Sequence, residues 1–170
     1  MKIQEFINIV SNLKQPYILI LIGPPLSGKD TVLKQMDLSD TVVISRDQIL
    51  MEVYGSDNYD EAFKNVNQKD VDYELQRRIN NASDNGENTI INMTNMTSKR
   101  RAHNLSQFGT EYTKIAIIFP ILEWGEYMKR NEKRKKEEFK FIPEHVLRNM
   151  ISSYQPIRET EGFDRVISLS

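Results

Sequence analysis

The sequence predicts an α/β fold in which helices cover both faces of a parallel sheet. Short apolar segments alternate with helical patterns along the chain, and the segments at residues 17–22 and 113–119 are nearly continuous apolar runs. Continuous apolar runs indicate strands that are covered on both faces. Connections of roughly 10–25 residues leave room for a helix at each crossover. We therefore expect a three-layer sandwich around a roughly five-stranded parallel sheet.

Strand and helix patterns follow one another along the whole chain. The predicted strands, each bounded by turn residues, cover residues 17–22, 41–44, 89–92, 113–119 and 165–169. The predicted helices cover residues 30–36, 47–54, 59–82, 99–108, 123–136 and 143–154. The last of these has a favourable helix N-terminus, because Pro143 stands in its first turn and Glu144 follows. An extra helix within residues 1–15, at about residues 3–13, precedes the first strand.

Length and composition favour a single soluble domain over residues 1–170. The chain has 23 Lys and Arg, 24 Asp and Glu, and no Cys. The missing Cys excludes a disulfide scaffold, a thiolate zinc site and a cysteine nucleophile. A formal net charge of −1 means that a polyanionic partner must be held by a local patch. The longest apolar run is much shorter than the ~20 residues of a membrane span.

The strongest functional signal lies directly after the first predicted strand, in a segment that also opens a predicted helix. This is the context that the phosphate-loop (P-loop) motif requires. The amides of such a loop cradle a β-phosphate, and its lysine, here Lys29, reaches the β- and γ-phosphates. The segment predicts a nucleoside triphosphate site. Its residues are Gly23, Pro24, Pro25, Leu26, Ser27, Gly28, Lys29, Asp30 and Thr31.

Asp30 departs from this motif, because a Ser or Thr that holds Mg²⁺ normally follows the lysine. The Asp30 carboxylate can face the metal directly or through water, which makes it the candidate metal ligand. Alternatively, Asp30 only favours the N-terminus of the helix, and water holds the metal. A GTPase switch is not expected, since the chain has no D-x-x-G element and the NQKD segment at residues 67–70 has the wrong order for a guanine reader.

Two charged residues, Arg46 and Asp47, follow the second predicted strand. Because the carboxyl ends of parallel strands collect at one edge of the sheet, Asp47 would lie beside the γ-phosphate. There it can orient an attacking hydroxyl and accept its proton. The alternative is that Asp47 only caps the helix that follows. Arg46 could clamp an acceptor phosphate or form a surface ion pair.

A basic helix near the C-terminus concentrates positive charge in an otherwise balanced chain. Arg130 and Arg134 are four residues apart, so both project from one face of this helix. Two Arg on a mobile lid could stabilise charge on a transferring phosphoryl group. The alternative is a solvated charged face.

Taken in order, these motifs resemble those of the polynucleotide 5′-hydroxyl kinase family, phage-type P-loop kinases to which phage hydroxymethyluracil DNA kinases are related. The resemblance implies a P-loop kinase sandwich with a helical lid at about residues 123–142. The matching segments are ISRD at residues 44–47, INMTN at 91–95 with SKRR at 98–101, KRNEKR at 129–134 and IPEHVLRNM at 142–150.

The resemblance implies ATP-dependent phosphorylation of a hydroxyl on a nucleic acid, most simply the 5′-hydroxyl end of DNA or RNA. ATP and Mg²⁺ are the implied cofactors. Lys29 would bind phosphate, Asp47 would be the general base, and Arg130 and Arg134 would hold the donor phosphates, with Arg134 also catalytic. The expected partner is a nucleic acid or nucleotide acceptor and no membrane. The expected location is the cytoplasm, that of the host if the protein is phage-encoded.

Two departures from the family pattern concern the acceptor. Leu50 stands where the family has an Arg that grips the acceptor phosphate, and Met93 replaces an Asp of the third-strand signature. The acceptor could therefore be a hydroxymethyluracil base in phage DNA. It could also be a (deoxy)nucleoside monophosphate held by Arg46, Arg100 and Arg101. The alternative outside the enzymes is a non-catalytic ATP-binding module.

Overall fold

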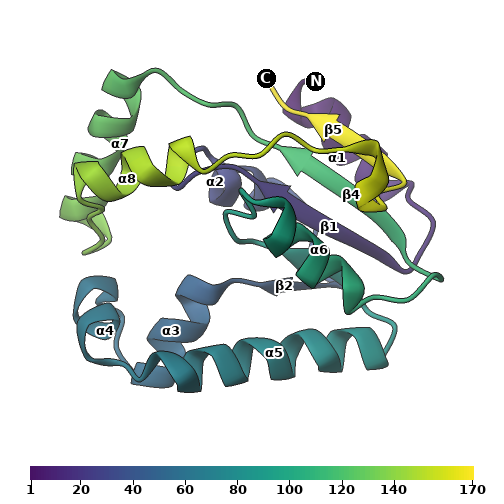
Figure 1. The fold of residues 1–170 in the computed structure, drawn as a ribbon, viewed down its shortest axis with the longest axis horizontal. Helices are drawn as coiled ribbons and strands as arrows, with labels where there is room; N and C mark the ends of the chain where they lie inside the picture. Colours follow the sequence, from purple (N-terminus) through teal and green to yellow (C-terminus); the bar gives the residue numbers. More distant parts are fainter.

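The computed structural model describes residues 1–170 and contains one five-stranded sheet with the strand order β2-β3-β1-β4-β5 (Figure 1). Every pairing is parallel, so the predicted fold class is confirmed. The buried run in the centre of the sheet is β1, as its continuous apolar sequence predicted. The strands are β1 (Tyr17–Ile22), β2 (Thr41–Ile44), β3 (Asn88–Ile91), β4 (Thr113–Ile118) and β5 (Arg165–Ser168).

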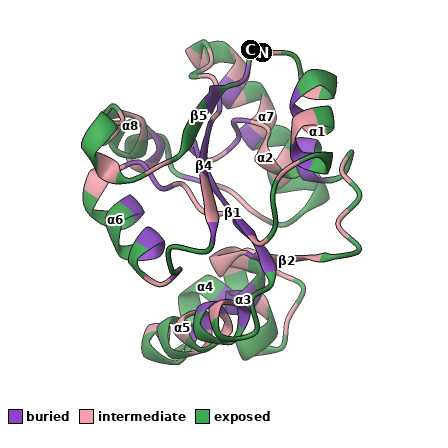
Figure 2. Ribbon diagram, turned by 90° about the vertical axis from the view of Figure 1, so that its right-hand side faces the viewer, coloured by how far each residue is buried: buried purple, intermediate pink, exposed green.

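Helices connect the strands and cover the sheet on both faces (Figures 1 and 2). None of them combines the length and the apolar character needed to cross a membrane. The α-helices are α1 (Ile3–Ser11), α2 (Lys29–Leu33), α3 (Arg46–Tyr54), α4 (Tyr59–Asn65), α5 (Gln68–Asp84), α6 (Ser98–Ser106), α7 (Trp124–Glu137) and α8 (Glu144–Ser152). A 3₁₀ turn, η1 (Glu159–Glu161), precedes β5.

The single helix expected over residues 59–82 is wrong, because two helices, α4 and α5, occupy this region. The chain is extended at Val66, where φ is −70° and ψ is 147°. The Asn67 side chain then accepts a hydrogen bond from the Lys69 amide at 3.0 Å and caps α5. Asn is a favoured N-cap residue, so this local chemistry starts a new helix inside a continuous helical pattern.

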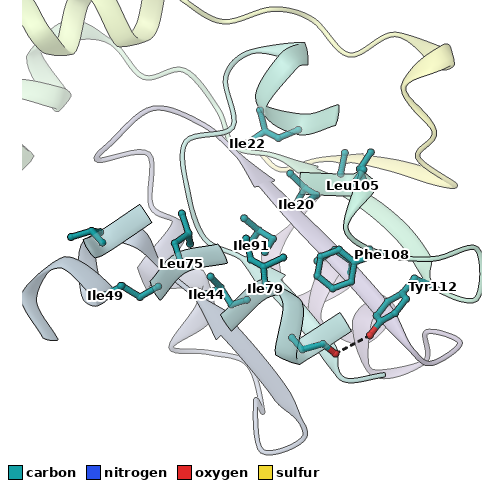
Figure 3. Packing of buried hydrophobic residues seen from close by; sticks show 14 of the residues in the cluster. Ile20, Ile22, Ile44, Ile49, Leu75, Ile79, Ile91, Leu105, Phe108 and Tyr112 are labelled. Atoms are coloured by element: carbon teal, nitrogen blue, oxygen red, sulfur yellow. Dashed lines mark hydrogen bonds between the residues drawn. The ribbon is translucent and has the colours of Figure 1, made fainter. Parts of the chain in front are cut away.

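The larger hydrophobic core lies between one face of the sheet and helices α3, α4, α5 and α6 (Figure 3). Ile20, Ile44 and Ile91 contribute the sheet side of this core, and Ile79 packs on them from α5. Burying each such side chain contributes about 1.5–3 kcal/mol to stability. Tyr112 closes the end of the core, and its hydroxyl donates to the carbonyl of Ala82 at 3.2 Å.

A second core lies on the opposite face of the sheet. Helix α1 contributes Phe6 and Val10, and α2 contributes Val32 and Leu33. The strands contribute residues to this core as well, among them Leu19 of β1. Figure 2 shows the buried residues concentrated on the strands and the exposed ones on the outer sides of the helices. The sheet is thus covered on both faces, as its nearly continuous apolar strands predicted.

The carboxyl ends of the strands carry the segments that the sequence marked as functional. The loop after β1 leads into α2, β2 leads into α3, and the segment after β4 leads into α7. Helices α3, α4, α7 and α8 therefore lie at the same end of the molecule (Figure 1). In parallel α/β folds this end is where ligands bind.

Candidate nucleotide-binding site

The phosphate loop, residues 23–31, folds back tightly between β1 and α2. Gly28 caps α2 with φ at +100°, and Leu26 also has a positive φ of +69°. A Cβ at Gly23 would lie 2.8 Å from Ser27 Oγ and 2.9 Å from Phe119 Cβ. Glycine is therefore favoured at position 28 by the backbone conformation and at position 23 by the close approach of neighbouring side chains. A loop of this conformation offers its amides to an anion, so it fits a phosphate group.

The Lys29 ammonium is held inside this loop. It donates to the carbonyls of Gly23 at 2.8 Å and Pro24 at 2.7 Å, and to Ser27 Oγ at 3.3 Å. Burial lowers the pKa of Lys29 to about 8, although the nearby carboxylates of Asp30 and Asp47 oppose this shift. Lys29 is therefore still mainly protonated at neutral pH. Phosphate oxygens could take the place of these loop acceptors, as the predicted role requires.

The Asp30 carboxylate lies in the first turn of α2 and accepts a hydrogen bond from Asn92 Nδ2 at 2.8 Å. Asn92 follows β3, so this contact joins the phosphate loop to the neighbouring strand. No cluster of three or more His, Cys, Asp or Glu side chains surrounds Asp30. Mg²⁺ is commonly held by one or two carboxylates together with phosphates and water. A single exposed carboxylate beside a phosphate loop fits that mode of binding.

Asp47 lies in the first turn of α3, but it does not cap the helix. Ser45 is the N-cap residue, with its Oγ accepting from the Gln48 amide at 3.4 Å, so the capping interpretation of Asp47 is wrong. The Asp47 carboxylate instead accepts a hydrogen bond from the Tyr59 hydroxyl at 3.3 Å and forms an ion pair with Lys140. It is also close enough to Lys29 to raise the pKa of that ammonium.

Helices α7 and α8 form a hairpin, residues 124–152, that packs on the phosphate loop. Arg130 donates from Nη1 to the carbonyl of Leu26 at 2.9 Å and from Nε to Glu126 at 2.6 Å. Arg134 is close enough to oppose the charge on Lys29, and its Nε donates to Glu138 at 3.2 Å. Arg130 thus contacts the loop directly, whereas Arg134 acts on it through its charge. Their neighbours Lys133, Lys135 and Lys136 are exposed, so the alternative of a solvated charged face describes these three residues.

A small third core fixes the position of this hairpin. Leu26 of the phosphate loop packs with Tyr127, Ile142 and Leu147 of the hairpin. The positive φ at Leu26 turns this apolar residue out of the loop, where the hairpin covers it. The loop and the two Arg are consequently held together by packing as well as by the hydrogen bond from Arg130.

Two of the three residues predicted to hold a monophosphate acceptor, Arg46 and Arg101, have structural partners, whereas Arg100 is exposed. Arg101 is fully buried, and its guanidinium donates to Glu161 at 2.7 Å and to the carbonyls of Asn95 and Met96. The expectation that Arg101 binds an acceptor is therefore wrong. Arg46 forms an ion pair with Asp72 at 2.9 Å. This agrees with the second of its two predicted roles, a surface ion pair.

The two positions that depart from the family pattern, Leu50 and Met93, are occupied by residues that pack in the core. Leu50 is fully buried on the inner side of α3, within the larger core. Met93 is half-buried and packs against the same core. Both side chains therefore contribute to the packing of α3 and of the loop after β3.

The sequence reasoning missed Lys140 and Asn92, which contact the two carboxylates of the site. Asn92 carried a usable signal, because it is a polar residue directly after a buried strand. Lys140 carried none, since it is one of many charged residues in the segment after Arg134. Its contact with Asp47 spans 93 positions of the sequence.

The likeness of this chain to solved structures supports the fold. A chain of the PezAT chromosomal toxin–antitoxin system of Streptococcus pneumoniae is 18% identical with a TM-score of 0.62, and the match covers 98% of this chain and 75% of that one. A gluconokinase from Sinorhizobium meliloti 1021 is 11% identical with a TM-score of 0.53, over 92% and 83%. A chain of the Pnkp1/Rnl/Hen1 complex is 17% identical with a TM-score of 0.52, over 90% and 45%.

Fold and phosphate loop together define a P-loop protein with a parallel α/β sheet. The family model described as an AAA domain matches residues 18–157, which include the phosphate loop, Asp47 and the α7–α8 hairpin. The chain belongs to this family. A search of curated proteins found no match to the sequence.

Proposed function

We propose that this protein is a kinase that transfers the γ-phosphate of ATP to a hydroxyl of a nucleic acid, most directly the 5′-hydroxyl end of DNA or RNA. The observation that carries the proposal is the shared position of Lys29, after β1, and Asp47, after β2, at the carboxyl end of one parallel sheet, where Asp47 also acts on the pKa of Lys29. A group that can activate an acceptor thus lies beside a group that can bind phosphate. Residues 1–170 would act as one kinase domain, with the α7–α8 hairpin as its lid.

In the proposed reaction, Lys29 exchanges its loop carbonyls for oxygens of the β- and γ-phosphates. Asp47 orients the acceptor hydroxyl and takes its proton, while the hydroxyl oxygen bonds to the γ-phosphorus and the bond to the β–γ bridging oxygen breaks. Arg130 and Arg134 stabilise the charge that develops on the transferred group. When bound, Mg²⁺ neutralises further phosphate charge, and Asp30 is the residue that would hold it.

Features beside Asp47 support a nucleic acid or nucleotide acceptor. The rings of Tyr59 and Phe63 are stacked, with centroids 5.9 Å apart, and Phe63 is exposed. Exposed aromatic rings can stack on bases, and a nucleobase is therefore a suitable neighbour for the reacting hydroxyl. A hydroxymethyluracil base in DNA fits the same surroundings. A free monophosphate is less well supported, because the Arg101 guanidinium is committed to Glu161.

Label transfer from γ-labelled ATP tests this proposal. The acceptors are 5′-hydroxyl DNA, 5′-hydroxyl RNA, DNA that contains hydroxymethyluracil, and deoxynucleoside monophosphates. We expect transfer to a 5′-hydroxyl oligonucleotide. Label on the modified base or on free nucleotides alone would overturn the 5′-end assignment. ATP binding without transfer to any acceptor would indicate a non-catalytic module instead.

Asp47→Asn tests the assigned base in the same assay. We expect a loss of transfer of about 100-fold or more, because general-base catalysis contributes roughly 10²–10⁴-fold, while ATP binding persists. The matched control is Asp70→Asn, which changes an exposed carboxylate in the first turn of α5. Unchanged transfer in Asp47→Asn would contradict the role given to Asp47.

A further inference from the structure

The connection between α7 and α8 reaches across the site to α4. We call residues 139–141 the strap. The Asp60 amide of α4 donates to the carbonyl of Phe139 at 3.2 Å, and the Phe141 amide donates back to Asp60 Oδ1 at 3.4 Å. Phe139 adopts a positive φ of +50°, and its side chain remains exposed. These contacts hold the strap against the start of α4, next to Asp47.

Lys140, at the centre of the strap, is directed onto Asp47. Its ammonium pairs with Asp47 Oδ2 and lies 4.1 Å from the centroid of the Tyr59 ring. The Tyr59 hydroxyl donates to the other oxygen, Oδ1, of the same carboxylate. The Lys140 side chain is only 12% exposed. Both oxygens of the proposed base therefore accept from protein donors, and one of these donors is an ammonium on a largely buried side chain.

We propose that Lys140 is a positioning residue that occupies Asp47 until an acceptor hydroxyl replaces it, and so suppresses hydrolysis of ATP by water. This inference rests on the kinase function proposed above. Binding energy from the rest of an acceptor can displace the ammonium and open the strap, whereas a water molecule has no such binding energy. Lys140 thereby favours transfer over hydrolysis.

Both reactions use the same step with different nucleophiles. In hydrolysis, the oxygen of water bonds to the γ-phosphorus, the bond to the β–γ bridging oxygen breaks, and ADP leaves with the electron pair. Asp47 takes the proton of the water, which is passed to solvent with the release of phosphate. In transfer, the acceptor hydroxyl replaces water. A carboxylate oxygen that already accepts from Lys140 is hindered as a proton acceptor in either case.

Lys140→Met removes the ammonium and keeps much of the side-chain volume. We expect ATP hydrolysis without acceptor to rise about tenfold, equivalent to ~1.4 kcal/mol in the barrier. The KM for the acceptor should fall while kcat for transfer changes little, since no ammonium has to be displaced. Lys14→Met is the matched control, because Lys14 is exposed just before β1, at the opposite end of that strand from the phosphate loop. Tyr59→Phe, which deletes one hydroxyl and keeps the ring, should give a smaller rise in hydrolysis.

Two results would overturn the inference while leaving the kinase function intact. The first is transfer of label by the wild type together with unchanged hydrolysis in Lys140→Met. The second is lower hydrolysis and a higher acceptor KM in Lys140→Met, which would make Lys140 an acceptor-binding group. If the wild type transfers label to no acceptor, the proposed kinase function itself fails.

Hydrogen–deuterium exchange tests the contact without reference to activity. The amides of Asp60 and Phe141 report on the strap, because each is hydrogen-bonded across it. We expect both Lys140→Met and Asp47→Asn to speed exchange at these two amides severalfold, with the helical amides of α8 unchanged. Unchanged exchange at the strap in both variants would show that the ion pair does not hold it closed, and would overturn the inference.

Discussion

Arg101 is the largest side chain that the structure buries completely. Its guanidinium forms one ion pair, with Glu161. The guanidinium joins the loop after β3, through the Asn95 and Met96 carbonyls, to η1. Removal of one partner from a buried ion pair costs about 3–5 kcal/mol, because the other charge is left without compensation. The stability of the loop beside the phosphate site therefore depends on a distant glutamate.

Glu161→Gln should lower the free energy of unfolding by about 3 kcal/mol at pH 7. The hydrogen bonds from Arg101 lower the pKa of Glu161 below its ordinary value. A carboxyl with a lowered pKa stabilises the fold above the ordinary value of ~4.3, and this contribution is lost as the pH falls through the lowered pKa. The difference between wild type and variant should thus shrink below about pH 4.

Urea unfolding at pH 7 and at successively lower pH measures this dependence. Glu159→Gln is the matched control, since Glu159 is exposed on the same 3₁₀ turn. A difference between wild type and Glu161→Gln that stays constant with pH would contradict the role given to the Arg101–Glu161 pair.

Residue positions were predictable where a local motif fixes the geometry. Lys29 and Arg130 lie where the loop motif and the helical spacing placed them. Arg101 and Lys140 were not predictable, because burial and ion pairing at these positions come from segments far away in the sequence. Two adjacent arginines illustrate the limit: Arg100 is exposed, whereas Arg101 is fully buried.

Elements were predictable to the extent that apolar pattern alone defines them. The bounds of β1 and β2 agree with the expected residues, because each strand is an apolar run with polar residues at its ends. The division between α4 and α5 was missed, because the helical pattern continues across Asn67, whereas the extended backbone at Val66 and the capping hydrogen bond of Asn67 separate the helices.

The α7–α8 hairpin depends on one buried amide. Asn131 of α7 donates from Nδ2 to the carbonyl of Ile142 at 2.7 Å and accepts at Oδ1 from the Ile142 amide at 3.1 Å. The side chain thus satisfies both backbone groups of a residue just before α8. Each buried group left without its partner costs about 1–3 kcal/mol.

Asn131→Leu should therefore destabilise the hairpin by about 2 kcal/mol or more. We expect faster hydrogen–deuterium exchange at the amide of Ile142 and its neighbours, with β1 protected as in the wild type. Asn149→Leu is the control, because Asn149 is exposed on α8. Equal exchange in Asn131→Leu and wild type would show that the third core holds the hairpin without this amide.

Across the whole molecule, near-neutral charge coexists with an uneven charge distribution. The last turn of α7 carries Arg134, Lys135 and Lys136, and the phosphate loop nearby adds Lys29. Positive charge is thereby gathered at the carboxyl end of the sheet although the net charge is −1. Such a local patch can hold phosphates at short range without attracting nucleic acid over the whole surface.

Helix α1 and the α7–α8 hairpin belong to different cores, which makes the cooperativity of the whole molecule testable. Phe6 of α1 packs in the second core, whereas Trp124, the only tryptophan, belongs to the third core at the α7–α8 hairpin. If residues 1–170 form one cooperative domain, a defect at Phe6 has to lower the stability that Trp124 reports. If the hairpin unfolds as a separate unit, Trp124 will not respond.

Phe6→Ala should lower the free energy of unfolding by about 3–5 kcal/mol, the usual cost of a large cavity in a core. We expect urea transitions followed by far-ultraviolet circular dichroism and by Trp124 fluorescence to move together to lower concentration. Asn8→Ala, on the exposed side of α1, should move neither. A shift in the dichroism transition with an unchanged Trp124 transition would contradict the single-domain prediction. It would also mean that the hairpin, with Arg130, Arg134 and Lys140, can open while the sheet remains folded.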